Sequence, residues 1–168
     1  MTTEPRFPRV VDDVTVRLIA GVVLLLALVA ITFQQWWIYP VLAIDFTLRA
    51  ALGPKASPLA LVVQHLIRPR LSTPKQPTAG PPKRFAAAIG AVLTSVAAIL
   101  WILGVAPMLM IAIGLIMVAF PALESILGLC VGCKVFGVLM RLGVVPEEIC
   151  LECADISLRK PARAAGPA

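Results

Sequence analysis

Residues 85–123 read FAAAIGAVLTSVAAILWILGVAPMLMIAIGLIMVAFPAL, a stretch of 39 residues without one charged side chain. A second uncharged stretch covers residues 18–44. A helical crossing of a bilayer needs about 20 apolar residues, so both stretches belong inside a membrane. The whole chain of 168 residues is 60% hydrophobic and 14% charged, with a mean hydropathy of +0.94, whereas about a quarter of the residues in soluble domains are charged. The sequence therefore predicts an integral membrane protein and excludes a soluble globular one.

Both stretches contain an interruption, so each is predicted to form a helical hairpin. In the first, two glutamines stand beside two tryptophans and a tyrosine within residues 34–40, a composition that fits the headgroup level. In the second, Gly104 suits the end of one helix and Pro107 the first turn of the next. The predicted fold class is all-α, an integral membrane four-helix bundle with a short cytoplasmic C-terminal helical hairpin. The four spans are expected at about residues 17–33, 36–52, 85–103 and 108–129.

Positive charges give the expected orientation of these spans. All 15 Lys and Arg residues lie at or before the start of the first span, at the end of the second, in the central loop or after the fourth span. Because basic residues are retained on the cytoplasmic side, we expect a multi-pass protein of the cell membrane with both termini and the central loop in the cytoplasm. The net charge of +6 is then an orientation signal, and no nucleic-acid partner is expected.

Two other topologies remain open from the sequence. In the first, the initial helix runs on to Tyr39, residues 41–52 lie in the outer interface, and the chain crosses only three times. In the second, the initial helix is a cleavable signal peptide, although the segment before it contains acidic residues and no Ala-x-Ala site precedes the glutamines. Four crossings are preferred because every cation then lies on one side or within reach of it.

The chain divides by composition into six segments. Within the central loop, the apolar residues 58–68 are too few to cross a bilayer and are expected to lie in its interface. A linker rich in Pro, Thr and Lys follows over residues 69–82. The predicted segments are a cytoplasmic N-terminal segment (1–16), a first transmembrane hairpin (17–52), a basic cytoplasmic loop with an interfacial helix (53–84), a second transmembrane hairpin (85–129), a four-cysteine hairpin (130–160) and a tail (161–168).

Four cysteines give the most specific chemical signal in the chain. They form two Cys-x-x-Cys pairs, Cys130 with Cys133 and Cys150 with Cys153, and 16 residues separate the pairs. This spacing falls within the range of four-thiolate zinc sites, and one pair alone also suits a redox disulfide or a carrier of persulfide sulfur. Three interpretations therefore remain: one structural Zn²⁺ bound by all four cysteines, a redox pair that needs no cofactor, and small apolar fillers.

In the redox interpretation, Cys130 is the expected nucleophile and Cys133 its partner in the disulfide. Lys134 follows Cys130 by four residues and favours a thiolate. A continuous last helix would place Cys130 in a helix interior, which does not favour a thiolate. Gly128 and Gly132 weaken the helix there, so a break that creates a new amino-terminal helix end remains open.

Three ionisable residues lie inside or at the edge of the apolar spans: Asp45, Arg49 and Glu124. Such groups are costly in hydrocarbon and usually face a partner or a wet cavity. Asp45 and Arg49 are four residues apart, so they can pair along one helix face. Glu124 is expected at a similar depth on the last span. An ion pair that packs helices and a carboxylate that handles protons near reactive thiols both remain open.

Several short motifs match the pattern of one membrane family. They are Asp-Phe-Thr-Leu-Arg-Ala at 45–50, Gly-Pro at 53–54 with Ser-Pro-Leu-Ala at 57–60, Pro-Pro-Lys-Arg-Phe-Ala at 81–86, and Gly-Leu-Cys-Val-Gly-Cys-Lys at 128–134. With these motifs, residues 8–142 resemble the bacterial membrane family called domain of unknown function 4395. The resemblance implies a small multi-span bundle with no established activity. The family looks like a frequent genomic companion of thioredoxin-like and sulfurtransferase proteins, which implies a thiol or sulfur context, and the second cysteine pair lies outside its pattern.

The sequence thus predicts a small integral membrane protein that acts as a thiol redox or sulfur-handling partner through a cytoplasmic-side pair, Cys130 and Cys133. The alternative is a structural accessory subunit of a larger membrane complex, in which four cysteines hold Zn²⁺. Besides the lipid bilayer, the expected partners are a thioredoxin-like or sulfurtransferase protein in the first case and a larger membrane complex in the second. No Ser/His/Asp set, Walker loop or pair of haem ligands is recognisable.

Overall fold

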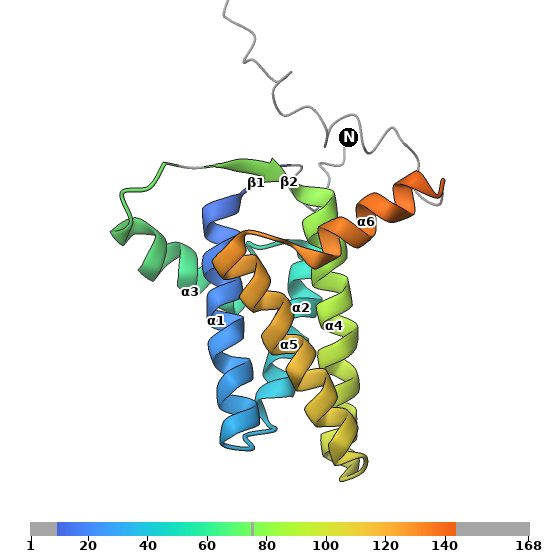
Figure 1. Cartoon of the computed structure of the whole chain (residues 1–168). Helices are drawn as coiled ribbons and strands as arrows, with labels where there is room; N and C mark the ends of the chain where they lie inside the picture. Colours follow the sequence, from blue (N-terminus) through green and yellow to red (C-terminus); the bar gives the residue numbers. More distant parts are fainter. Residues whose placement is uncertain (1–9, 75, 144–168) are drawn as a thin grey trace, which may run out of the picture.

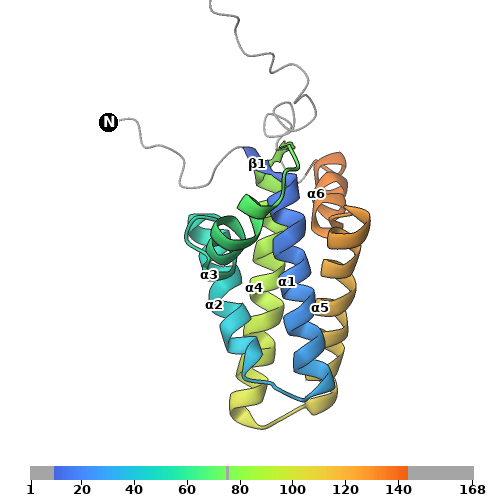
Figure 2. The same ribbon diagram turned by 90° about the vertical axis from the view of Figure 1, so that its left-hand side faces the viewer.

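Four helices packed side by side form the body of the protein in the computed structural model, which describes residues 10–74 and 76–143 (Figure 1). α1 (Asp13–Thr32) and α2 (Ile38–Leu52) form one antiparallel hairpin. α4 (Gly80–Leu103) and α5 (Pro107–Leu127) form the second. The view in Figure 2 shows all four helices aligned along one axis. The most extensive contacts join α1 to α5 and α2 to α4, so each hairpin packs mainly against the other.

Three of these helices are long and apolar enough to cross a membrane, namely α1, α4 and α5. α2 has 15 residues, a length of about 22 Å at 1.5 Å per residue, which is less than the hydrocarbon core of about 30 Å. The membrane character and the helical class predicted from the sequence therefore stand, and the crossing by α2 stays a prediction. Beside these helices, the described residues contain two strands of three residues each.

The turn between α1 and α2 lies where the cluster of amides and aromatic rings predicts it. Gln34 has a φ of +52°, which reverses the chain direction after α1. Gln35 accepts a hydrogen bond of 2.9 Å from the indole N–H of Trp37, and the rings of Trp36 and Tyr39 stack 6.0 Å apart. The first helix therefore does not continue to Tyr39, and the alternative of one longer initial helix is wrong.

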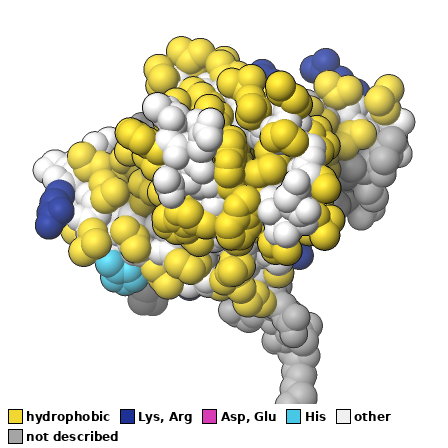
Figure 3. Space-filling model, turned by 90° about the horizontal axis from the view of Figure 1, so that it is seen from below, with side chains coloured by type: hydrophobic (Ala, Val, Ile, Leu, Met, Phe, Trp, Pro, Cys, Tyr) yellow, Lys and Arg dark blue, Asp and Glu magenta, His cyan; other side chains and the backbone are white. Residues whose placement is uncertain are grey.

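The second tight turn lies beside the first, at the lower end of the molecule in Figure 1. Gly104 ends α4 in the left-handed conformation, and Pro107 is the first residue of α5, as the sequence predicts. Figure 3 shows this end of the molecule, with hydrophobic and other uncharged side chains across its centre and Lys and Arg only at the margins. The charged residues therefore gather toward the opposite end, which we call the charged end.

Small residues allow the four helices to approach closely in the core. Ala27 and Ala30 of α1 and Ala97 of α4 have no exposed surface. They pack with Leu42, which is also fully buried, in the central hydrophobic cluster. Helices in membranes rely on this kind of close backbone approach, because lipid tails offer no hydrophobic driving force between them.

At the charged end, β1 (Val10–Asp12) pairs antiparallel with β2 (Pro77–Ala79). The pairing ties the segment before α1 to the end of the central loop, so that α1 begins at Asp13 and α4 at Gly80, each four or five residues earlier than predicted. The linker predicted over residues 69–82 therefore ends in a strand and a helix start. Three-residue strands carry no alternation of side chains for a sequence pattern to detect.

Asp12 is the main polar contact of this strand pair. Its carboxylate accepts hydrogen bonds from Thr15 Oγ1 at 2.7 Å, from Arg68 Nε at 2.9 Å and from the backbone N–H of Gln76 at 2.9 Å. Burial raises the pKa of Asp12, but these hydrogen bonds outweigh burial and leave the pKa below its ordinary value. The central loop is thus fastened to the start of α1 by a charged side chain.

The apolar loop segment predicted over residues 58–68 is helical. α3 (Pro58–Val62) continues through a π-helical turn (Val63–Ile67) into a 3-10 turn (Arg68–Arg70). Ser57 caps α3, because its Oγ accepts from the Ala60 N–H at 3.2 Å. The segment lies beside α1 and α2 at the charged end (Figures 1 and 2).

Asp45 joins α2 to this segment. Only 1% of Asp45 is exposed, and its carboxylate forms an ion pair with Arg49. The same carboxylate accepts hydrogen bonds from Ser57 Oγ at 2.6 Å and from the Leu59 N–H at 2.9 Å. A buried carboxylate is tolerated only when its charge and its oxygens are satisfied in this way.

We predict that Asp45→Asn lowers the unfolding temperature in detergent far more than Ser57→Ala does. The Asn side chain has nearly the same volume but leaves the Arg49 charge uncompensated, a loss of about 3 kcal/mol or more. Ser57→Ala removes a helix cap and one hydrogen bond, which costs about 1 kcal/mol. Thermal unfolding of the purified full chain measures both. Equal shifts for the two variants would contradict this account of Asp45.

Candidate functional site

The site begins where the last long helix breaks. α5 ends at Leu127, Gly128 has a φ of +70°, and α6 (Val131–Arg141) starts a new direction across the charged end (Figure 1). Arg17 of α1 donates a hydrogen bond of 3.3 Å to the Ile126 carbonyl in the last turn of α5. A Cβ atom at position 128 would lie 2.9 Å from Arg17 Nη2. The break that the sequence left open is therefore present, and its left-handed backbone favours glycine.

Cys130 occupies the N-cap position of α6, and Cys133 lies in the first turn of the same helix. Both are free thiols; Cys130 is buried, and Cys133 is half-buried. Unpaired N–H groups at a helix amino terminus favour negative charge, so this placement favours a thiolate. The break thus puts the first cysteine at the type of helix end that the redox interpretation needs.

The two thiols have pKa values shifted in opposite directions. The nearby thiol and backbone N–H of Cys133 lower the pKa of Cys130, against the opposing effects of burial and of Glu124, while the Lys83 charge lowers it further. The nearby Cys130 sulfur, together with burial, raises the pKa of Cys133 well above its ordinary value. Of the two thiols, Cys130 therefore loses its proton more readily.

Gly132 seats this helix start on α4. A Cβ atom at position 132 would lie 2.7 Å from the Cα of Ala86, a distance that real side chains do not show. Farther along α6, the ring of Phe136 lies 5.6 Å from the ring of Phe85. The small residue between the two cysteines is therefore what allows the thiols to lie against the bundle.

Lys83 is the charged residue that the sequence analysis missed. Its Nζ lies 2.7 Å from Glu124 Oε1 and 3.4 Å from Asp13 Oδ1, and its side chain is only 10% exposed. These three residues come from α4, α5 and α1, so one ammonium group connects the three helices that can cross the membrane. The predicted loop 53–84 includes Lys83, although Pro81 just before it is typical of the first turn of a helix.

The three ionisable residues singled out in the sequence fall into two neighbouring groups. Asp45 pairs with Arg49, whereas Glu124 pairs with Lys83 and lies beyond ion-pair distance of Arg49. The guanidinium carbon of Arg49 lies 4.9 Å from the centre of the Phe46 ring. Its Nε is buried and has no hydrogen-bond partner among the residues that the structure describes.

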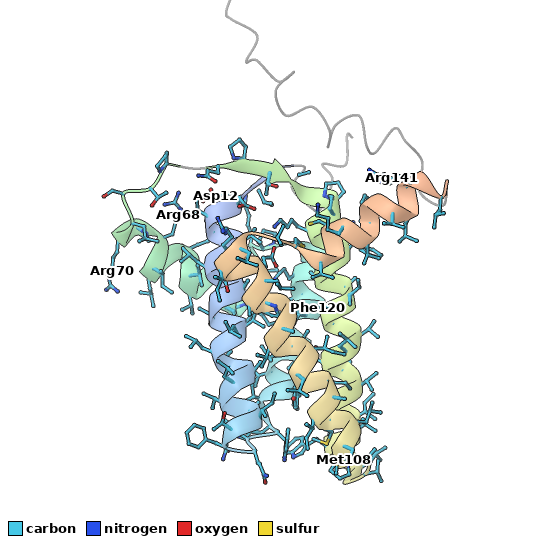
Figure 4. All side chains as sticks on the ribbon, in the orientation of Figure 1. Asp12, Arg68, Arg70, Met108, Phe120 and Arg141 are labelled. Carbon is cyan, nitrogen blue, oxygen red and sulfur yellow. The ribbon has the colours of Figure 1, made fainter. Side chains whose placement is uncertain are left out.

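A cavity of about 180 Å³ connects these groups. It lies between α1, α2, α4 and α5, and α6 closes its charged end. Arg49, Lys83, Glu124 and Cys130 line that end, whereas the remaining lining is almost entirely apolar. Figure 4 shows Phe120, one of the apolar lining residues, on the part of α5 that faces α4. The buried thiol, two cations and a carboxylate thus share one apolar cavity.

Metal binding remains a prediction for this chain. Within residues 10–74 and 76–143, no three His, Cys, Asp or Glu side chains gather as a metal site. The predicted four-cysteine site also needs Cys150 and Cys153, and these lie outside the described residues, as does the second half of the predicted C-terminal hairpin. Lys134, the cation expected to favour the Cys130 thiolate, is exposed, and Lys83 exerts that effect instead.

Comparison with known proteins identifies the family. The family described as Domain of unknown function (DUF4395) matches residues 11–141. The chain belongs to the DUF4395 family. No curated protein and no solved structure matches it. The DUF4395 match runs from β1 to the last residue of α6, so it includes Cys130 and Cys133 and ends before Cys150 and Cys153.

In this DUF4395 protein, Gly132→Ala should increase the rate at which a water-soluble maleimide labels Cys130 roughly tenfold. The added methyl group overpacks the contact with Ala86 at a cost of about 1–3 kcal/mol, which favours states in which α6 has separated from α4. Gly137→Ala is the matched control on the same helix, since nothing lies within 4 Å of a Cβ atom there. Mass spectrometry of the labelled peptides measures both rates. Equal labelling of Cys130 in the two variants would show that Gly132 does not seat the helix.

Proposed function

We propose that this protein crosses the cell membrane four times and acts as a thiol redox or sulfur-handling partner through Cys130 and Cys133. The observation that carries the proposal is the position of Cys130, at the amino-terminal end of α6 and in a cavity shared with Lys83. A thiolate at such a position is both a nucleophile and a good leaving group in thiol–disulfide exchange.

The proposed topology places both termini, the central loop and the thiols on the cytoplasmic side. The uncharged turns at the opposite end support it, since basic residues are retained in the cytoplasm. α2 then crosses as a short helix, with its aromatic start at one interface and Arg49 in its last turn toward the other. An impermeant maleimide should therefore modify the thiol introduced by Ser72→Cys, at an exposed position of the central loop, in inverted membrane vesicles and leave it unmodified in intact cells.

The two cysteines take different roles in the proposed exchange. In the disulfide form of the pair, a thiolate of the partner protein attacks the Cys133 sulfur, which is the more exposed of the two. A mixed disulfide forms as the Cys130–Cys133 bond breaks, and Cys130 leaves as the stabilised thiolate. A second thiolate of the partner then attacks its own mixed disulfide and releases Cys133, which takes up a proton. The partner is oxidised by two electrons, and the pair is reduced.

The chemistry of the partner follows from this step. A thioredoxin-like protein supplies two neighbouring thiols, which the exchange requires. A sulfurtransferase instead supplies a persulfide to the reduced pair: a thiolate of the pair attacks the outer sulfur of the persulfide, the persulfide S–S bond breaks, and the sulfurtransferase leaves as a thiolate. Either partner would meet Cys133 on the outer side of α6, next to the exposed and basic Lys134.

We predict that the purified full chain forms a reversible Cys130–Cys133 disulfide in a thiol redox buffer and carries no stoichiometric metal. Cys130→Ser and Cys133→Ser should each abolish this disulfide, whereas Cys150→Ser, the matched control, should leave it intact. Free-thiol titration, peptide mass spectrometry and elemental analysis measure these quantities on one sample.

A different result would favour the structural role. If each chain holds one zinc ion, all four thiols are protected from reagents, and each Cys→Ser variant loses metal, then the cysteines form a closed tetrahedral site. The redox proposal would then be wrong. The protein would instead be an accessory subunit whose C-terminal segment is held by Zn²⁺.

A further inference from the structure

We propose that the cavity beneath Cys130 binds the ring of a lipid-soluble quinone, which takes the electrons of the Cys130–Cys133 pair. This inference rests on the proposed thiol redox function and adds the electron acceptor to it. Four observations point to this ligand: the size and lining of the cavity, its opening, its polar end, and the different surroundings of the two thiols.

The size and lining of the cavity suit a ring. Its volume is about 180 Å³, and an apolar cavity of about 150 Å³ in another protein holds benzene. The walls are formed by side chains that offer only van der Waals contact to a ligand, and they come from four helices. They include Ile19, Val23, Phe46, Ala87 and Met117.

The cavity opens toward the side of the bundle. Phe120 of α5 and Val135 of α6 line it and are 38% and 41% exposed, so part of its wall is also outer surface. In Figure 1, α5 leans away from α4 toward the charged end, the segment between α5 and α6 crosses the space between them, and α6 lies across α4. Since the exposed lining there is apolar, the opening suits a ligand that arrives from the hydrocarbon phase.

The polar end of the cavity suits quinone oxygens. Quinone carbonyls only accept hydrogen bonds, and they gain negative charge when the ring is reduced. Lys83 and Arg49 both line this end and carry positive charge. Donors fixed where negative charge develops stabilise it strongly in a site without water. Glu124, the acidic group at this end, is already held by Lys83.

The two thiols are placed between an inner ligand and an outer partner. Cys130 lines the cavity, whereas Cys133 is more exposed and does not belong to the lining. Reducing equivalents can therefore enter through Cys133, in exchange with a partner protein, and leave through Cys130, in contact with the ring.

The proposed transfer balances atoms and electrons. The Cys130 thiolate adds to a ring carbon, a C–S bond forms, and an electron pair moves onto one quinone oxygen. Cys133, once deprotonated, attacks the Cys130 sulfur; the S–S bond forms, the C–S bond breaks, and its electron pair stays with the ring. The resulting quinol dianion takes up two protons, equal in number to those released by the two thiols. One quinone becomes one quinol, and one dithiol becomes one disulfide.

The test uses the full chain in lipid nanodiscs, reduced and kept without oxygen. The probe is a short-chain benzoquinone with all ring positions substituted, which cannot permanently arylate a thiol. We expect one quinol and one Cys130–Cys133 disulfide per chain. Ultraviolet absorbance measures the quinol, and peptide mass spectrometry measures the disulfide. Ile89→Trp adds bulk at a half-buried lining residue and should slow the reaction by about tenfold or more. Val92→Trp on the same helix, 63% exposed and outside the lining, should not.

A small water-soluble disulfide reagent separates the two proposals, and thermal unfolding checks that the variants are folded. If this reagent oxidises the pair but the quinone does not, the quinone inference is wrong and the proposed redox function stands. If neither oxidant produces the Cys130–Cys133 disulfide, the redox function itself is wrong. If the quinone oxidises Ile89→Trp as fast as the unchanged chain, the ring does not bind in this cavity, and the assignment is overturned.

Discussion

The arrangement of the site depends on one buried ammonium group. Lys83 lies between Glu124, at 2.7 Å, and Asp13, at 3.4 Å, and so joins α4 to α5 and to α1. A charge at such a place is stable only with partners, because transfer of an unpaired ion out of water is very costly. The ion pair therefore fixes where the helices meet at the charged end. It also places a positive charge at the cavity and near the buried thiol.

The cysteine pair depends on backbone geometry as much as on charge. Gly128 allows the chain to turn after α5, and Gly132 lets α6 approach α4 to a distance at which a methyl group would clash with Ala86. Together they put Cys130 at a helix amino terminus, where it is buried, and leave Cys133 accessible one turn later. On an uninterrupted helix, the same two thiols would not lie at a helix end and would not differ in exposure. Both of these features support the proposed thiol–disulfide exchange.

The sequence predicts the parts of this fold that depend on neighbours along the chain. The turn at residues 34–37, the Gly104 and Pro107 boundary, and the weak helix at Gly128 all follow from local chemistry. The partners of charged residues do not, since spacing along a helix does not fix how that helix is rotated against the others. Thus Asp45 could be paired with Arg49 on one helix, but the contact of Glu124 with Lys83, 41 residues away, could not be derived. The same holds for Asp12 and Gln76, which are joined by strands too short to leave a pattern.

The folded bundle lowers the pKa of Cys130, and the pH dependence of the alkylation of this thiol tests that most directly. Iodoacetamide labelling of the reduced full chain, followed by mass spectrometry of each cysteine peptide, gives an apparent pKa for each thiol. We predict a lower pKa for Cys130 than for Cys133, and an increase in the pKa of Cys130 in Lys83→Met, which removes the nearby positive charge. The control Lys134→Met, at the exposed cation that follows Cys133, should leave the pKa of Cys130 unchanged. Equal pKa values for the two thiols, unaffected by Lys83→Met, would contradict the account.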